Sequence, residues 1–297
     1  MRCDGAAFVI SSYSVANAML ALAIQRSSLI LASLLLLLLV CHTSPIFASA
    51  LSSSSSSSGT TLRRQPIGRL TSLDRSKSDT QRDNDFYSRP NLVTHTDDAF
   101  IAKLTALYDE LLPKDAVILD MMSSHVSHLP PQKVQSNYYA RVDVHGMNEK
   151  ELMTNEARRL TNGNAYVRNL NDNPSFVGLA DTGTYDCILC CVGVQYLEEP
   201  EQVFAEVARI LKPDTGLCIV SFTNRFFYQK ALVGWMERGM KERSRLVTDY
   251  LRAAGGFVEG EIEVRGDGTG AVAQLLSLGG VGGDPFVAVV GKRDGSE

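Results

Sequence analysis

The sequence lacks an excess of positive charge. Its 29 lysines and arginines are outnumbered by 33 aspartates and glutamates, which gives a formal net charge of −4. Proteins that bind nucleic acid need a basic surface that neutralises phosphates, so the composition argues against a nucleic-acid partner. The apolar run from Leu29 to Val40 is about twelve residues long, short of the roughly 20 that span a bilayer. No membrane partner is expected for the folded part.

Cysteine is also sparse, and its arrangement does not indicate a disulfide framework. The four cysteines outside the N-terminal region, Cys187, Cys190, Cys191 and Cys218, lie in apolar, strand-like runs typical of buried thiols. On a strand, alternate residues face opposite sides, so Cys190 would point away from Cys187 and Cys191. The latter two would lie about 13 Å apart at roughly 3.3 Å per residue. This geometry excludes a tetrahedral metal site, and we expect no metal.

Residues 1–50 have the features of a secretory signal. Arg26 precedes the short apolar run, and Ala48, Ser49 and Ala50 form a small-x-small cleavage pattern after Pro45. The alternative is an uncleaved signal that anchors the chain in the endoplasmic reticulum membrane.

Residues 51–85 are rich in serine, threonine and arginine and contain few large apolar side chains. Such a segment cannot bury enough surface to offset chain entropy, so the sequence predicts a disordered, transit-like linker. A signal followed by this composition resembles the bipartite presequence of algae with secondary plastids, although Leu51 stands where an aromatic residue is usual. The predicted location is a plastid of secondary origin. A secreted or lumenal protein with a flexible linker remains the alternative.

From residue 86 to residue 297, apolar runs alternate with amphipathic stretches, and we expect one domain. The periodicity predicts helices at 96–113, 148–160, 200–211, 225–238 and 242–254. Strands are predicted at 117–120, 140–145, 165–170, 185–194, 217–222, 257–265 and 285–293. This alternation implies an α/β fold with a doubly wound, mostly parallel sheet.

In such a sheet, ligands bind beyond the carboxyl ends of the strands. The candidate site therefore begins at Asp120 and continues through the residues that follow the other strands: 145–148, 169–172, 191–196 and 222–225.

The turn after the first strand lacks glycine. Met122, Ser124 and Val126 stand where a Gly-x-Gly-x-Gly turn would place its glycines. A nicotinamide-dependent oxidoreductase needs a Gly-x-Gly-x-x-Gly turn at this point, so that function is disfavoured.

The run "YDCILCCVGVQYLEEPEQVFAEVARILKPDTGLCIVSF" resembles, in order and spacing, one block of a known family. That family is the class I S-adenosylmethionine-dependent methyltransferases of the type 11 group. The resemblance extends from Phe86 to Arg293. The "D-x-M-S-S" turn and the "FYSRP…VTH" lead-in are similar to those of a subgroup of this family. The resemblance implies a seven-stranded sheet with an antiparallel last strand, and S-adenosylmethionine as cofactor.

Carried over by position, the resemblance implies cofactor-binding roles for Asp120, Met122, Ser123, Ser124, Gly146, Asn148, Asn171 and Cys191. Asn148 replaces the acid that usually binds the ribose hydroxyls, and its amide can still bond them without charge assistance. Met122 or Val126 at positive φ would be strained. We therefore expect the turn to take another path, with Ser123 and Ser124 binding the amino-acid half of the cofactor.

Methyl transfer needs mainly in-line alignment of a nucleophile, and a general base only where that nucleophile is protonated. The candidates are Tyr196, Gln195 and His125, each with a structural role as the alternative. The predicted function is methyl transfer to a small-molecule acceptor. A non-catalytic S-adenosylmethionine-binding or scaffold protein on the same fold is the alternative.

Overall fold

The computed structural model describes residues 70–267 and 283–295. Every described residue belongs to one compact unit of the chain. The predicted signal sequence at 1–50 and the linker up to residue 69 lie outside the described residues. These assignments, and the plastid location that rests on them, stay predictions. Within the described ranges, no helix is long and apolar enough to cross a membrane.

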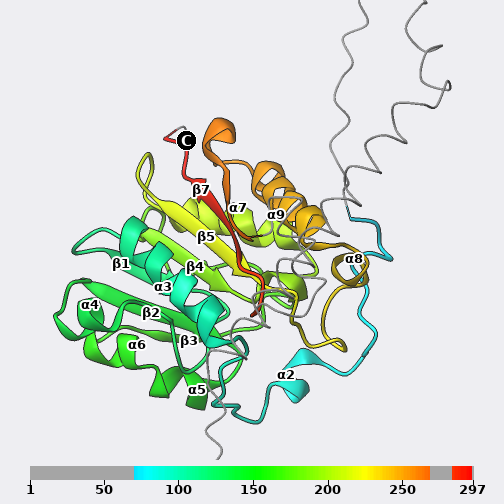
Figure 1. Cartoon of the computed structure of the whole chain (residues 1–297), viewed down its shortest axis with the longest axis horizontal. Coiled ribbons are helices and arrows are strands. Elements are labelled where there is room, and N and C mark those ends of the chain that lie inside the picture. Colours follow the sequence, from blue (N-terminus) through cyan, green and yellow to red (C-terminus); the bar gives the residue numbers. More distant parts are fainter. Residues whose placement is uncertain (1–69, 268–282, 296–297) are drawn as a thin grey trace, which may run out of the picture. The chain divides into compact units, whose positions relative to one another are not determined.

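A seven-stranded sheet with the order β3-β2-β1-β4-β5-β7-β6 organises the domain (Figure 1). Its strands are β1 (Val117–Asp120), β2 (Arg141–Gly146), β3 (Ala165–Val167), β4 (Cys187–Cys191), β5 (Leu217–Phe222), β6 (Glu263–Gly266) and β7 (Val287–Lys292). β7 runs antiparallel to both of its neighbours, and the remaining pairs are parallel. The predicted doubly wound sheet with an antiparallel last strand is confirmed.

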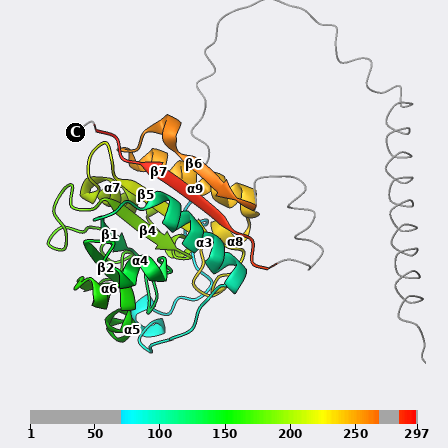
Figure 2. The ribbon, with the colours of Figure 1, turned by 60° about the vertical axis from the view of Figure 1, so that its left-hand side comes forward.

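Helices cover both faces of this sheet (Figures 1 and 2). One face packs against α3 (Asp98–Leu111), α4 (Pro131–Gln135) and α6 (Glu156–Leu160). The other packs against α7 (Pro200–Ile210), α8 (Val233–Met236) and α9 (Met240–Ala254). The amphipathic patterns of the sequence thus bury two apolar layers, one on each side of the strands.

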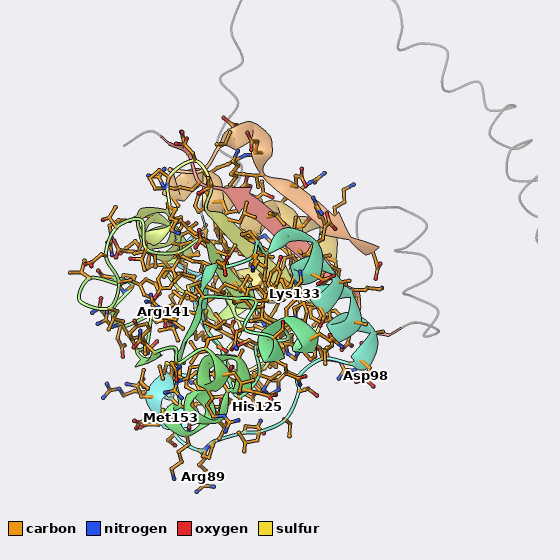
Figure 3. The ribbon with its side chains drawn as sticks, turned by 90° about the vertical axis from the view of Figure 1, so that its left-hand side faces the viewer. Arg89, Asp98, His125, Lys133, Arg141 and Met153 are labelled. Carbon is orange, nitrogen blue, oxygen red and sulfur yellow. The ribbon has the colours of Figure 1, made fainter. Side chains whose placement is uncertain are left out.

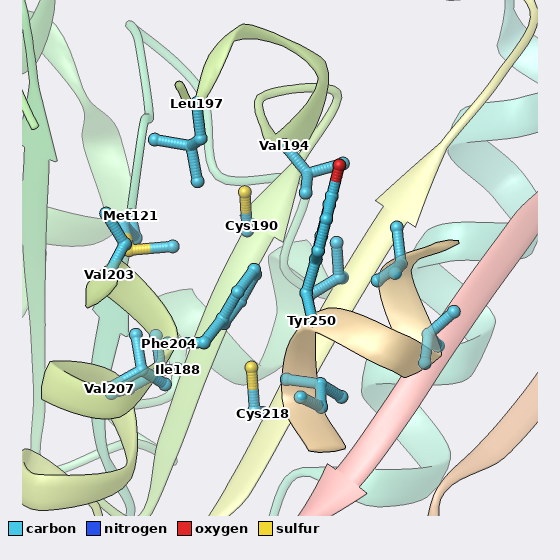
Figure 4. Close-up of a cluster of buried hydrophobic side chains, with 14 of the residues drawn as sticks. Met121, Ile188, Cys190, Val194, Leu197, Val203, Phe204, Val207, Cys218 and Tyr250 are labelled. Atoms are coloured by element: carbon cyan, nitrogen blue, oxygen red, sulfur yellow. The ribbon is translucent and has the colours of Figure 1, made fainter. Parts of the chain in front are cut away.

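The cysteines divide between these layers as the strand alternation predicts. Cys190 and Cys218 point into the layer of α7 and α9, beside Phe204 and Tyr250 (Figure 4). Cys187 belongs to the opposite layer. All four thiols outside the N-terminal region are free.

The helix predicted over 148–160 is divided in two. α5 (Glu149–Thr154) and α6 are separated by Asn155, whose side chain accepts a hydrogen bond from the Arg158 amide. Asn155 is fully buried, and its Nδ2 donates to Ser127 Oγ at 2.9 Å and to the Ser124 carbonyl at 3.2 Å. The break therefore ties the helices to the turn that follows β1.

The helix predicted over 225–238 is also wrong for most of its length, since only α8 forms there. The Phe227 amide donates to the hydroxyl of Tyr196, and the Leu232 amide donates to the carbonyl of Gln195. These tertiary bonds replace helical ones and hold residues 225–232 against the carboxyl ends of the strands. The strand predicted over 257–265 is likewise formed only at β6.

Residues 70–96 are here named the lead segment. They pack onto the domain, so the domain begins before the predicted boundary at residue 86. Leu70 is buried in the core, Lys77 forms a β-bridge with Leu232, and α2 (Asp83–Phe86) follows. The part of the predicted disordered linker from residue 70 to residue 85 is thus packed onto the domain. Composition does not predict this packing, because the segment is polar and its anchoring depends on charge.

That anchoring centres on Lys230, which is fully buried. Its Nζ lies 3.3 Å from Asp79 Oδ2 and 3.4 Å from Asp83 Oδ1, and it donates to the Gln81 carbonyl. Asp83 also accepts from Lys77 at 2.8 Å and from Asn171 Nδ2 at 3.0 Å. A buried ammonium needs such partners, because leaving it unpaired is strongly unfavourable.

We predict that Asp83→Asn destabilises the domain by about 2 kcal/mol, because hydrogen bonds to charged groups are lost beside a buried lysine. The measurement is the free energy of unfolding in urea. Asp85→Asn, on the exposed side of α2, is the matched control and should change stability little. Equal stabilities of the two variants would show that the charge cluster does not hold the lead segment.

Candidate functional site

A cavity of about 580 Å³ lies beyond the carboxyl ends of β1, β2, β3 and β4. All the residues predicted for the site line it: Asp120, Met122, Ser123, Ser124, His125, Gly146, Asn148, Asn171, Cys191, Gln195 and Tyr196. The lead segment forms a further wall, and residues 225–227 complete the lining. The structure therefore brings together residues that are far apart in the sequence, at the edge of the sheet where they were predicted to meet.

The turn after β1 differs from the predicted path. Met122 has a φ of 57°, so it does adopt the left-handed conformation that we expected the turn to avoid. Its amide donates to His145 Nδ1 at 3.3 Å, and the Ser123 amide donates to the His145 carbonyl at 2.7 Å. These two bonds hold the turn in a conformation that glycine would adopt without strain.

Gly146 fits closely against this turn. A Cβ atom at residue 146 would lie 2.5 Å from the carbonyl oxygen of Ser123. Gly193 is similar, since a Cβ there would lie 2.8 Å from Cβ of Met122. The glycines that permit close contact with the turn thus stand beside it and not within it.

His145 is locked by its neighbours. Besides accepting from Met122 at Nδ1, it donates from Nε2 to the Arg168 carbonyl at 3.0 Å, which fixes its tautomer. Burial lowers the pKa of His145 to about 4, so the imidazole stays neutral. Its role is to join the turn after β1 to the chain after β3.

Asp120 is buried at the end of β1 and accepts from Ser123 Oγ at 2.5 Å. Burial raises the pKa of Asp120 to about 6, and the hydrogen bonds from Ser123 and Ser127 only partly offset this effect. The carboxylate therefore holds the serine turn at the cavity wall.

Asn148 has a different role from the predicted ribose contact. Its Oδ1 accepts from the amides of Lys150 and Glu151 at the start of α5. Its Nδ2 donates to the carbonyls of Tyr87 and Ser88 at 3.0 and 3.1 Å. Asn148 is therefore the N-cap of α5 and an anchor for the lead segment, and both protons of its amide are in use.

The side-chain amide of Asn171 is also fully hydrogen-bonded within the protein. Its Nδ2 donates to Asp83 and to the Tyr196 carbonyl, both at 3.0 Å, and its Oδ1 accepts from the Glu198 amide. Cys191 lines the cavity, but burial raises the pKa of its thiol to about 12. A thiol with so little thiolate is not a nucleophile.

Of the predicted catalytic candidates, Gln195 donates from Nε2 to the Val192 carbonyl at 2.7 Å. Tyr196 accepts the Phe227 amide at its hydroxyl oxygen, which leaves the hydroxyl proton to donate elsewhere. The Tyr196 ring stacks on that of Phe227, with centroids 6.2 Å apart. Burial raises the pKa of Tyr196, so its hydroxyl stays protonated. His125 Nδ1 lies 3.2 Å from Ser124 Oγ.

The sequence did not reveal several lining residues. Glu151, on the first turn of α5, accepts from Ser124 Oγ at 2.7 Å and from the Asn91 amide at 2.6 Å. Phe86, Tyr87 and His95 come from the lead segment. The N-cap role of Asn148 could have been predicted from the sequence. An asparagine directly before a helix that starts with acidic residues is typical of an N-cap.

Residues 129–220 match the family model described as a methyltransferase domain. No curated protein matches the chain in sequence.

Similar solved structures include the [4+2]-cyclase SpnF, with 13% identity, coverage of 65% of this chain and 82% of that one, and a TM-score of 0.45. Phosphoethanolamine N-methyltransferase 2 of Haemonchus contortus, in complex with S-adenosylmethionine, has 10% identity, coverage of 65% and 52%, and a TM-score of 0.43. An S-adenosylmethionine-dependent methyltransferase from Mesorhizobium loti has 18% identity, coverage of 63% and 96%, and a TM-score of 0.42.

The matched segment contains β2, β3 and β4, whose carboxyl ends form the cavity together with that of β1, which lies before the segment. Residues 129–220 thus match a methyltransferase domain, and such a domain implies S-adenosylmethionine as the cofactor.

The residues at the cavity fit this cofactor. A volume of about 580 Å³ falls within the range of small-ligand sites. The close approach at Gly146 brings the backbone of the turn to the cavity, and the carboxylate of Asp120 and the hydroxyl of Ser123 can meet the charged amino-acid half. Thr96 Oγ1, from the lead segment, is buried without a hydrogen-bond partner at the cavity and can serve a ligand.

We predict that Asn148→Asp weakens the domain, because a carboxylate cannot donate to the Tyr87 and Ser88 carbonyls and would repel them. The expected loss is about 2 kcal/mol in the free energy of unfolding. Asn173→Asp, on an exposed loop, is the control. Unchanged stability together with tighter S-adenosylhomocysteine binding would restore Asn148 to the ribose.

The raised pKa of Asp120 predicts a pH dependence of stability in the unliganded protein. Between pH 3.8 and about 6, the folded state binds a proton at Asp120 that the unfolded state has released. Stability from this group is fully present below pH 3.8 and is lost as the pH rises through about 6, a change of roughly 3 kcal/mol. Asp120→Asn should remove that component when urea unfolding is compared across this range. Parallel curves for both proteins would contradict it.

Proposed function

We propose that the chain transfers a methyl group from S-adenosylmethionine to a small-molecule acceptor, and that both bind in the cavity at the strand ends. The observation that carries this proposal is the wall formed by the lead segment. It extends the strand-end site into a cavity of about 580 Å³, a size that suits a cofactor with a small acceptor.

Within this cavity, we assign the polar side to the cofactor. That side comprises Asp120, Ser123, Gly146, Asn171 and Cys191. When bound, S-adenosylmethionine supplies an activated methyl group, so the chain has to align the acceptor and exclude water. The aromatic side chains of the lead segment and of residues 226–227 face the remaining space and form the acceptor side.

A non-catalytic cofactor-binding protein remains the second candidate. The observation that favours it is the strained, glycine-free turn at Met122. The two functions differ in turnover: both predict cofactor binding, and only the enzyme releases S-adenosylhomocysteine when an acceptor is supplied.

We predict that the full chain binds S-adenosylmethionine and S-adenosylhomocysteine in isothermal titration and does not bind NADH. Asp120→Ala should abolish binding, because it removes the carboxylate that serves the ligand or holds the serine turn. Glu149→Gln, an exposed change on α5, is the control and should bind as the unmodified chain does. Unchanged affinity in Asp120→Ala would remove Asp120 from the site, and binding of NADH alone would overturn the proposed function.

A further inference from the structure

Four histidines line the cavity: His95, His125, His128 and His145. Three of them are poorly placed to accept a proton. Both ring nitrogens of His145 are bonded. Burial lowers the pKa of His128 to about 4, and nearby His125 and His95 add to the effect. Burial also lowers the pKa of His95, whose ring packs edge-on against Phe227 with centroids 5.2 Å apart.

His125 differs because a hydrogen-bonded chain sets its tautomer. Ser124 Oγ lies 2.7 Å from Glu151 Oε2 and 3.2 Å from His125 Nδ1. A hydroxyl has one proton to donate, and a carboxylate only accepts. The Ser124 proton therefore goes to Glu151, and Ser124 Oγ accepts from His125 Nδ1–H.

This tautomer determines the state of the other ring nitrogen, Nε2. With the proton at Nδ1, His125 Nε2 carries a lone pair, and no described residue bonds to it. The opposite arrangement, with Ser124 donating to His125, would leave two oxygens 2.7 Å apart without a proton between them. His125 lies at the same end of the domain as Arg89 and Met153 (Figure 3).

Glu151 is itself held in place. Its second carboxylate oxygen accepts from the Asn91 amide of the lead segment at 2.6 Å. It lies on the first turn of α5, three residues after the Asn148 cap. The hydrogen bonds of Glu151, Ser124 and His125, with that of Asn91, thus join α5, the turn after β1 and the lead segment. They orient the imidazole at the cavity wall.

The acceptor side of the cavity is aromatic. Phe86 contacts Tyr87 and Phe227 with ring centroids 4.9 and 5.7 Å apart, and Tyr196 stacks on Phe227. Aromatic rings pair favourably with other rings in stacked or edge-on geometry. A planar aromatic acceptor suits this wall better than an aliphatic one.

We propose that His125 is the general base for methylation of a phenolic hydroxyl, and that Ser124 and Glu151 are positioning residues that present its Nε2 to the acceptor. The proposal rests on the proposed function and names its acceptor class. The phenol O–H bond breaks, and its proton passes to Nε2. The oxygen electron pair forms the new C–O bond as the methyl–sulfur bond of the cofactor breaks, with that bond's electrons remaining on sulfur. The proton then leaves to solvent.

The first test is independent of turnover. In the full chain labelled with ¹⁵N-histidine, the ¹⁵N spectrum of His125 should show a protonated Nδ1 and an unprotonated Nε2. Glu151→Gln and Ser124→Ala should shift His125 towards a mixture of tautomers, and Glu149→Gln on the exposed side of α5 should leave it unchanged. A spectrum with the proton at Nε2 in the unmodified chain would overturn the proposal, as would identical spectra for all the variants.

The second test uses phenol as the probe. With the protein saturated by S-adenosylhomocysteine, added phenol should shift the Nε2 resonance of His125, and cyclohexanol should shift it less. Absence of a phenol-induced shift in a protein that binds S-adenosylhomocysteine overturns the acceptor class and leaves the proposed function standing. Absence of cofactor binding in the same sample points instead to failure of the proposed function.

The third test is turnover on a panel of simple phenols and primary amines, followed by release of S-adenosylhomocysteine. Phenols should be methylated, and His125→Gln should reduce kcat at least about a hundredfold, the contribution of a general base, with cofactor affinity unchanged. Methylation of amines alone, or full activity of His125→Gln on a phenol, would overturn the proposal.

Discussion

The site depends on one constraint: both ring nitrogens of His145 are hydrogen-bonded. Its Nδ1 accepts from Met122 and its Nε2 donates to the Arg168 carbonyl, while its own carbonyl accepts from Ser123. One side chain at the end of β2 therefore fixes the turn after β1 and the chain after β3. The arrangement requires a neutral ring, because a doubly protonated imidazole would repel the Met122 amide. Burial supplies that condition by lowering the pKa of His145 to about 4.

The same edge of the sheet concentrates backbone strain. Met122, His128 and Val192 line the cavity and have φ values of 57°, 53° and 45°. For a β-branched residue such as Val192, positive φ is a clear outlier. Both of its backbone groups are bonded, the amide to the Ser221 carbonyl and the carbonyl to Gln195 Nε2. Strain that is held by several bonds at one site is typical of functional regions.

The sequence predicted the sheet and the location of the site because both depend on local patterns. Continuous apolar runs such as 117–120 and 217–222 can be recognised as buried parallel strands, and ligand sites follow from their carboxyl ends. The roles of individual residues were harder to predict. Met122 could be forced to positive φ only by a partner such as His145, which follows it by 23 residues. Residues 225–232 were predicted as helix because nothing local reveals that Tyr196 and Gln195 bond their amides.

The order of the lead segment was also hard to predict, because it depends on charged residues that are distant in the sequence. Its residues from 70 to 85 are polar, and composition predicts disorder. They are ordered because Lys230, some 150 residues away in the sequence, is buried against Asp79 and Asp83. Hydrophobic patterning carries no information about such a pair, since neither partner belongs to an apolar stripe.

Asn148 joins the two features of the site, the glycine-free turn and the lead segment. A carboxylate at residue 148 could bind a ribose hydroxyl, but it could not donate to the carbonyls of Tyr87 and Ser88 that Nδ2 reaches. An asparagine caps α5 equally well and supplies those donors. The carboxylate of this region stands instead three residues later, at Glu151, where it accepts from both the serine turn and the lead segment. The asparagine at residue 148 is thus coupled to the lead segment, because only an amide can both cap the helix and hold that wall of the cavity.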